Sequence, residues 1–327
     1  SDSGVSVSVP PMSDMPRISH TKSMDYYYTI LSKFEISPIT YSTYYSLAWC
    51  YNDLGDFDSA VTLMELVTKN DSCPYTPQAW MYLGEYYFDN GKLDSAVLAY
   101  RSVMTHPESE WFDDALYKLA WTQYRLSNPK KAISSFLALV DLGKNEKTGK
   151  ALLENESLDY IAISFSETDI TGENGLERAI TFCKKLDDEI KGTQILHRLG
   201  DVYDKQGRYS IAIKTYRTLL KMYPDYKLNP HVEAGLIKSM SRTLSIIESS
   251  KLKIDYFKKY NRRSKWTLSQ NDKKTIASAD SIAASQLYDA SVAYHQVALQ
   301  KNAKSAYDRA VKSYRLFIKF YKLLPEA

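Results

Sequence analysis

The stretch "AWMYLGEYYFDNGKLDSAVLAYRSVMTHP", residues Ala79–Pro107, decides the fold. Its bulky residues recur at helical intervals of three, four and seven, as in Trp80, Leu83 and Tyr87. It contains two glycines and no proline before its last residue. Spacings of three and four place side chains on one face of a helix, whereas a strand would need a period of two. The stretch therefore predicts two helices joined by the short polar turn "DNGKL".

The second half of this stretch begins a repeat along the chain. A small residue is followed four positions later by a bulky residue, and a second bulky residue comes three positions after that. The same pattern recurs at shifts of 36 residues, at Ala60, Met64 and Val67, at Ala96, Tyr100 and Val103, and at Ala132, Phe136 and Leu139, with Met24, Tyr28 and Leu31 one step upstream. A second pattern precedes each of the three patterns that begin with Ala60, Ala96 and Ala132. It is led by Leu47-Ala48, Leu83-Gly84 and Leu119-Ala120. Each unit is thus expected to be a helix, a turn and a second helix, with the small residues allowing the helices to approach closely.

These units closely resemble the tetratricopeptide repeat family. The stretch Thr193–Tyr226 is similar to a consensus copy, and the quoted stretch matches the same signature positions. The matching residues are Leu196, Leu199, Gly200, Tyr203, Ala212, Tyr216, Leu219 and Pro224 in the first, and Trp80, Leu83, Gly84, Tyr87, Ala96, Tyr100 and Pro107 in the second. The resemblance implies an all-α fold, a right-handed superhelical α-solenoid of stacked antiparallel helix pairs.

Four segments are expected along the chain. Residues 1–20 are rich in Ser and Pro and are predicted to form a disordered leader. Residues 21–247 are expected to form the solenoid, a half repeat followed by about five helical hairpins. Residues 248–275 are interpreted as a basic helix end and linker, and residues 276–327 as a C-terminal hairpin of the same type.

Composition and motifs argue against catalysis. The 327 residues carry a formal charge of +3, three well-separated cysteines and no apolar run long enough to span a membrane. The five histidines lack metal-ligand spacing, and neither common glycine-rich phosphate motif occurs. We therefore expect no enzyme activity, no metal and no cofactor.

The resemblance also implies where a partner binds, because the first helix of each pair lines the inner surface of such arrays. The positions it indicates are Tyr45, Trp49 and Asn52, then Met81, Glu85 and Phe88, then Tyr117, Trp121 and Tyr124, and finally His197 and Asp201. Aromatic and Met side chains at these positions suit an interface. The alternative is that Trp49 and Trp121 pack against neighbouring units. Some family members clamp a peptide carboxylate with Lys, Asn and Arg at these positions. Here the positions hold Tyr45, Trp49, Tyr82 and Lys118, so this clamp is not expected.

A second candidate surface is "KLKIDYFKKYNRRSKW", residues Lys251–Trp266, with seven Lys or Arg residues and four aromatic residues. Such a segment can bind single-stranded nucleic acid or an acidic partner, or it can be a solvated helix end whose aromatic residues pack inward. The first hypothesis for function is a non-enzymatic scaffold that holds a peptide or helix of a partner protein. The alternative is an adaptor for nucleic acid or an acidic partner. A further similarity, to bacterial envelope and outer-membrane assembly proteins, implies the periplasm or cell envelope.

Overall fold

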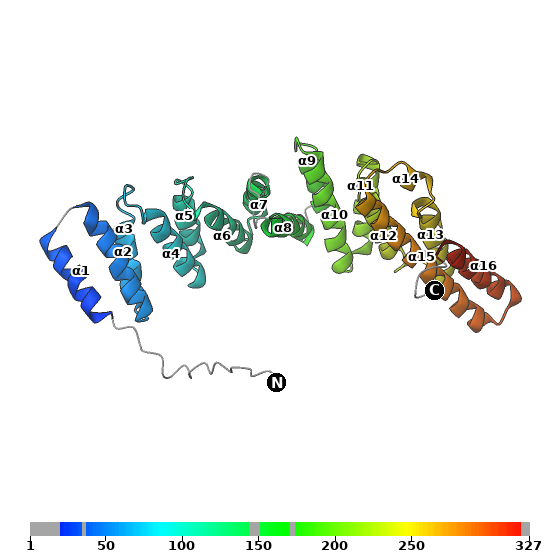
Figure 1. Ribbon diagram of the computed structural model, residues 1–327, viewed down its shortest axis with the longest axis horizontal. Helices are drawn as coiled ribbons and strands as arrows, with labels where there is room; N and C mark the ends of the chain where they lie inside the picture. Colours follow the sequence, from blue (N-terminus) through cyan, green and yellow to red (C-terminus); the bar gives the residue numbers. More distant parts are fainter. Residues whose placement is uncertain (1–19, 35–36, 144–150, 171–173, 322–327) are drawn as a thin grey trace, which may run out of the picture. The chain divides into compact units, whose positions relative to one another are not determined.

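A computed structural model describes residues 20–34, 37–143, 151–170 and 174–321. The predicted leader lies almost entirely outside these residues. The described residues form helices, turns and connectors, with no strand among them. The expected all-α fold of stacked helix pairs is confirmed (Figure 1).

In chain order, the helices are α1 (Thr21–Lys33), α2 (Pro38–Asp53), α3 (Phe57–Val67), α4 (Thr76–Asp89), α5 (Leu93–Val103), α6 (Phe112–Arg125), α7 (Pro129–Gly143), α8 (Ala151–Ile170), α9 (Gly175–Cys183), α10 (Glu189–Lys205), α11 (Tyr209–Met222), α12 (Asn229–Met240), α13 (Ile246–Tyr260), α14 (Lys265–Leu268), α15 (Lys273–Lys301) and α16 (Lys304–Tyr321).

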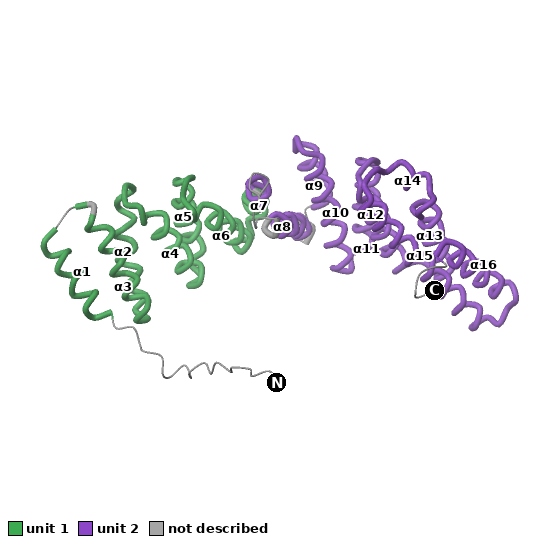
Figure 2. Tube along the Cα trace, in the orientation of Figure 1, with its two compact units in different colours: residues 1–135 green, residues 136–327 purple. Residues whose placement is uncertain are grey.

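The chain divides into two compact units, which Figure 2 colours separately. Unit 1 comprises Ser1–Ser135 and unit 2 comprises Phe136–Ala327. The boundary falls inside residues 21–247, which we expected to form one solenoid. Residues 248–275, interpreted as a helix end and linker, contain most of α13 and all of α14, and both helices pack within unit 2.

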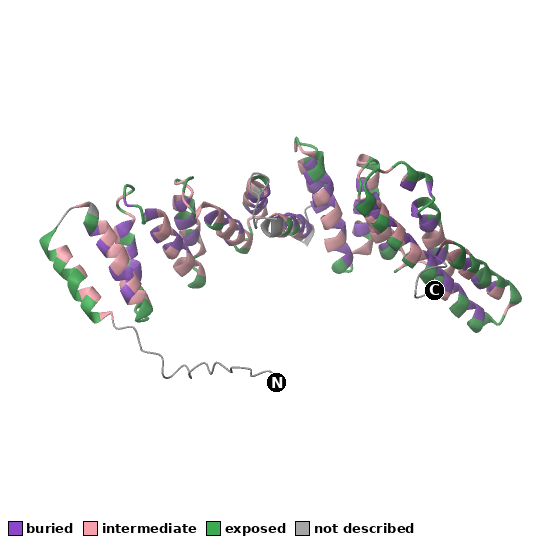
Figure 3. Ribbon diagram, viewed as in Figure 1, coloured by how far each residue is buried: buried purple, intermediate pink, exposed green. Residues whose placement is uncertain are grey.

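In unit 1, α2 pairs with α3 and α4 pairs with α5, and α6 follows against α5. Gly55 and Gly91 end α2 and α4 with φ of +80° and +71°, a left-handed conformation that favours glycine. The chain then reverses into the second helix of each pair. Figure 3 shows buried positions along the sides of α2 to α5, whereas α1 has no fully buried residue.

Glycine and tyrosine fit together inside each consensus-like pair. A Cβ added to Gly84 of α4 would lie 2.5 Å from Cε1 of Tyr100 of α5, so only glycine leaves room for the ring. Tyr100 is fully buried and its hydroxyl donates to Oε1 of Glu85 at 2.9 Å. The carboxylate beside the glycine therefore satisfies the polar end of a tyrosine that would otherwise be buried without a partner.

Unit 2 repeats this arrangement and extends it across three helices. A Cβ on Gly200 of α10 would lie 2.4 Å from Cε1 of Tyr216, and a Cβ on Gly235 of α12 would lie 2.9 Å from Cζ of the same ring. The Tyr216 hydroxyl donates to Oδ1 of Asp201 at 2.7 Å. The Tyr216 ring of α11 therefore packs against two first helices, α10 and α12, and each helix has a glycine at the contact. We call this packing the Tyr216 wedge.

The rest of unit 2 packs around aromatic side chains. Tyr256, Phe257 and Tyr260 of α13 and Tyr321 of α16 share one core with Leu287 of α15. The four rings are 2% exposed or less, and each buried tyrosine hydroxyl has an acceptor. The chain's many tyrosines therefore supply apolar packing while keeping their hydroxyl groups hydrogen-bonded.

Candidate partner-binding surfaces

Side-chain contacts between α2 and α4 begin the first candidate surface. The rings of Trp49 and Tyr82 meet edge to face, with centroids 5.7 Å apart. The Tyr82 hydroxyl donates to Oδ1 of Asn52 at 2.9 Å. All three side chains are half-buried. Trp49 therefore packs against the next repeat, as the alternative to partner binding predicted, but part of its ring remains accessible.

The contacts continue from α4 to α6. Nζ of Lys118 lies 2.9 Å from Oε2 of Glu85, and the Arg125 guanidinium lies over the Phe88 ring, 4.5 Å from its centroid. Glu85 thus holds both Tyr100 of its own pair and Lys118 of the next first helix. Successive first helices of unit 1 are consequently tied together by side chains at the predicted positions.

An aromatic row lies along α6. Trp121 meets Tyr117 and Tyr124 edge to face, with centroid separations of 6.3 and 5.9 Å. These separations fall in the favourable range for aromatic pairs. All three side chains are half-buried, so each orients its neighbour and retains accessible surface.

Tyr75 extends this surface and was missed by the sequence prediction. Its ring stacks on Tyr45 with centroids 4.3 Å apart and planes within 4°. Tyr75 is 38% exposed and lies just before α4. Helical spacing could not find it, because it belongs to the connector between repeats.

Met81 does not belong to this surface, and the prediction for it is wrong. Met81 is only 7% exposed and shares a core cluster with Tyr100, Ala115 and Leu119. The unbranched, flexible Met81 side chain packs there with residues of α5 and α6. Tyr45 and Tyr117 occupy the equivalent positions of their own repeats, and their rings remain half-buried.

We define the first-helix face of unit 1 by the residues that remain. It consists of Tyr45, Trp49, Asn52, Tyr75, Tyr82, Glu85, Phe88, Tyr117, Trp121 and Tyr124. It carries aromatic rings, one amide, one carboxylate and several hydroxyl groups, with Lys118 and Arg125 at its α6 side.

His197 and Asp201 belong to unit 2 and form a separate candidate set. The His197 ring meets Tyr226 edge to face at 6.4 Å, and Asp201 accepts the Tyr216 hydroxyl. Burial lowers the pKa of His197, and the Asp201 charge opposes that shift in part. Asp201 has a structural task like that of Glu85, since each holds the tyrosine of its own helix pair.

In the basic segment Lys251–Trp266, Tyr256, Phe257 and Tyr260 are buried in the core of unit 2. Trp266 is half-buried and meets Tyr260 edge to face at 5.1 Å. Its cations also form ion pairs, as Arg262 does with Asp280 at 2.9 Å. The three buried rings cannot stack on bases, so three of the four aromatic residues of this segment pack inward.

Metal and thiol chemistry find no support in the described ranges. No group of three or more His, Cys, Asp or Glu side chains there is placed to hold a metal ion. The Cys183 thiol is buried against the Gly192 carbonyl, and burial raises its pKa to about 12. None of the helices described is long and apolar enough to cross a bilayer.

Three stretches of the chain match known protein-family models. Tetratricopeptide-repeat models match residues 45–105, 114–142 and 193–226. These ranges include the helix pairs in which glycine and tyrosine fit together. These three stretches of the chain match the tetratricopeptide repeat family. Proteins of this family are generally non-enzymatic scaffolds for protein partners.

Individual relatives are distant. A TPR repeat-containing protein of Methanocaldococcus jannaschii is 28% identical over 166 residues, which are 48% of this chain and 25% of the relative. The match therefore spans about a quarter of that curated relative. The envelope-assembly similarity and its compartment stay predictions, since this match does not address them.

Two solved structures are similar in fold. YrrB, described as a TPR protein with an unusual peptide-binding site, has a TM-score of 0.36 and 14% identity, covering 64% of this chain and 98% of its own. A tetratricopeptide repeat protein from Parabacteroides merdae has a TM-score of 0.35 and 14% identity, covering 84% and 98%. Similarities this distant carry no statement about what the present chain binds.

Proposed function

We propose that the chain is a non-enzymatic scaffold and that the first-helix face of unit 1 binds a peptide or helix from a partner protein. One observation carries the proposal. Half-buried aromatic side chains on three successive first helices are held in place by contacts such as Trp49 with Tyr82 and Arg125 with Phe88. Side chains already ordered before binding lose less conformational entropy when a partner arrives.

The chemistry of the face suits a segment that is partly apolar. Tyr and Trp rings provide large contact areas with few rotatable bonds, and such residues dominate the binding energy of many interfaces. Asn52 and the tyrosine hydroxyl groups can exchange hydrogen bonds with the backbone of an extended peptide or with polar side chains of a helix. The Glu85–Lys118 pair, with both side chains about one-third exposed, adds a polar contact at the centre.

A selection from a random peptide library displayed on phage tests this proposal. Peptides enriched on the full chain are synthesised with a fluorophore, and their affinities are measured by fluorescence anisotropy. We expect Trp121→Ala to weaken binding by about 2 kcal/mol, roughly 30-fold, as for other aromatic anchors.

Leu98→Ala is the matched control. Leu98 is 65% exposed on α5, a second helix, and does not belong to the first-helix face. Circular dichroism checks that Trp121→Ala keeps its helix content, and Phe88→Ala provides a second test if it does not. Equal loss of affinity in Leu98→Ala, or no enriched peptide at all, would refute the proposal.

The nucleic-acid alternative has less support. It depended on aromatic and basic residues lying together on the surface of the segment Lys251–Trp266, and three of those aromatic residues are 2% exposed or less.

A further inference from the structure

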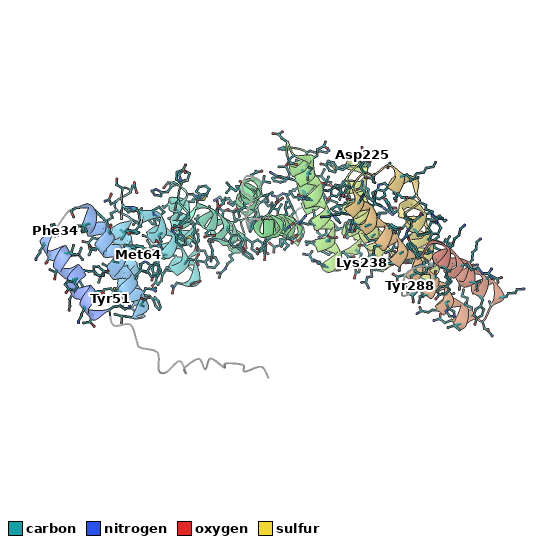
Figure 4. The ribbon with its side chains drawn as sticks, viewed as in Figure 1. Phe34, Tyr51, Met64, Asp225, Lys238 and Tyr288 are labelled. Atoms are coloured by element: carbon teal, nitrogen blue, oxygen red, sulfur yellow. The ribbon has the colours of Figure 1, made fainter. Side chains whose placement is uncertain are left out.

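A cavity of about 470 Å³ lies in unit 2 among α12, α13 and α15. The residues that matter at its wall are Lys238, Ser241, Arg242, Lys253, Gln286 and Asp289. We call it the anion cavity. Lys238, which belongs to α12, is labelled in Figure 4. None of these residues belongs to the first-helix face of unit 1.

Three cations converge on this cavity, and they are anchored differently. Lys238 Nζ lies 2.6 Å from Oδ2 of the buried Asp204. Burial alone would raise the pKa of Asp204, but hydrogen bonds from Lys238 and Ser239 lower it and keep the carboxylate charged. Asp204 thus fixes Lys238 in place while leaving its side chain 59% exposed.

The other two cations are less neutralised. Lys253 Nζ is 3.3 Å from the half-exposed carboxylate of Asp289, a long contact for an ion pair. The Arg242 guanidinium lies 5.9 Å from the centroid of the Tyr209 ring. Its charge contributes to lowering the pKa of Asp204, but no ion-pair contact within 4.0 Å joins it to a residue the structure describes. Its N–H groups therefore remain available to an anion at the cavity wall.

The surrounding chain is strongly basic. Residues 205–321 contain 23 Lys and Arg residues and 8 Asp and Glu residues. Such an excess produces a positive potential that attracts anions and raises their local concentration. The near-zero charge of the whole sequence conceals this feature.

The cavity wall also carries an acceptor. Oε1 of Gln286 on α15 is buried and has no hydrogen-bond partner among the described residues. A buried acceptor without a donor is costly, so a ligand that brings an N–H group gains from meeting it. The phosphodiester groups of a nucleic acid bring only acceptor oxygen atoms, whereas a peptide carries an N–H group next to each side chain.

We propose that the anion cavity binds an acidic peptide segment. The side-chain carboxylate of an Asp or Glu in that segment accepts hydrogen bonds from Arg242 and Lys253, and a neighbouring backbone N–H donates to Gln286. A single-stranded nucleic acid fits less well, because Tyr256, Phe257 and Tyr260 of the adjacent basic segment are buried and cannot stack on bases. The proposal is independent of the first-helix face of unit 1.

Fluorescence anisotropy with defined probes tests it on the full chain. The first probe is a fluorescein-labelled peptide of alternating Glu and Gly, the second has Gln in place of Glu, and the third is an oligothymidylate of the same formal charge as the first. At an ionic strength of about 0.15 M, where long-range attraction is screened, we expect the chain to bind the Glu peptide in preference to the other two.

The variants assign that binding to the cavity. Arg242→Gln with Lys253→Gln should weaken it at least about tenfold, because both charge-assisted hydrogen bonds are lost. Lys251→Gln with Lys265→Gln removes the same charge from exposed residues outside the cavity and should leave affinity nearly unchanged. Gln286→Met, which removes the acceptor, should weaken binding about threefold or more. Thermal melting checks the fold, and Lys253→Gln alone provides the test if the double variant unfolds.

Three results would overturn the proposal. The first is that the Gln peptide binds as tightly as the Glu peptide. The second is that both double variants lose affinity equally. The third is that the oligothymidylate binds more tightly than the Glu peptide, through Arg242 and Lys253. The second result would mean diffuse attraction, and the third would mean a site for phosphates. None of the substituted residues lies in unit 1, so failure here leaves the peptide-binding proposal for unit 1 intact.

Discussion

Gly200→Ala adds one methyl group where the Tyr216 wedge meets α10. The new Cβ would lie 2.4 Å from Cε1 and 2.7 Å from Cδ1 of the ring. The ring is also held elsewhere, because its hydroxyl is bonded to Asp201 and its Cζ and hydroxyl oxygen lie close to Gly235 of α12. It is also 1% exposed, so it cannot swing into solvent.

Two effects oppose each other in this variant. Alanine is favoured over glycine inside a helix by about 1 kcal/mol. Overpacking a filled core costs about 1–3 kcal/mol, and the fixed ring puts this site at the upper end of that range. We therefore expect a net loss of roughly 2 kcal/mol in the free energy that protects α10, α11 and α12 from opening.

Gly192→Ala, on the same helix, is the control. Its Cβ would lie 3.2 Å from the Tyr223 hydroxyl and 3.4 Å from Cβ of Cys183, contacts that a small shift can relieve. The free energy of unfolding of this variant should be equal to that of the wild type or higher by up to about 1 kcal/mol.

Hydrogen exchange followed by mass spectrometry suits the test, because repeat proteins open locally rather than as one cooperative block. Amides of α10 and α11 should exchange roughly 30-fold faster in Gly200→Ala, the factor that corresponds to 2 kcal/mol. If Gly200→Ala is protected as well as Gly192→Ala, the Tyr216 wedge does not hold these helices together and the reasoning fails.

Three other predictions follow from burial and charge. Ala96→Leu and Ala212→Leu should each cost about 1–3 kcal/mol because both positions are fully buried, and wild-type melting temperatures would place them away from the helix crossing. Met81→Ala should lower stability by about 2–5 kcal/mol and leave peptide affinity nearly unchanged, and the reverse outcome would return Met81 to the binding face. Burial lowers the pKa values of His197 and His231 from 6.5, so their contribution to stability is complete above pH 6.5 and is lost as the pH falls below it. Melting curves of wild type and of His197→Gln with His231→Gln between pH 7.5 and 5.5 check this, since the variant should lose less stability than the wild type.

Local spacing was sufficient for the helix pairs. Ala96, Tyr100 and Val103 recur at the spacing that defined each helix pair, and each has no exposed surface. Helical periodicity predicts which side chains are buried in a helix pair, because these side chains lie on the face that contacts the adjacent helix. The same spacing assigned Gly84 to a close contact, and the Tyr100 ring now explains why that position is glycine.

Features that depend on the next repeat were not predictable in this way. Met81 is buried because α6 covers it, and Tyr75 joins the surface because its connector passes beside Tyr45. The positions of α6 and of this connector depend on long-range packing. The anion cavity was missed for the same reason, since Arg242, Lys253 and Gln286 come from three separated segments.

Photo-crosslinking tests the central claim of peptide binding to the first-helix face of unit 1 most directly. A photoreactive phenylalanine analogue replaces Phe88, Trp121 or, as the control, Leu98, and each variant is irradiated with a peptide enriched on the wild-type chain. The account predicts covalent adducts at positions 88 and 121 and little at position 98. Adducts at position 98 alone, or equally at all three positions, would contradict it.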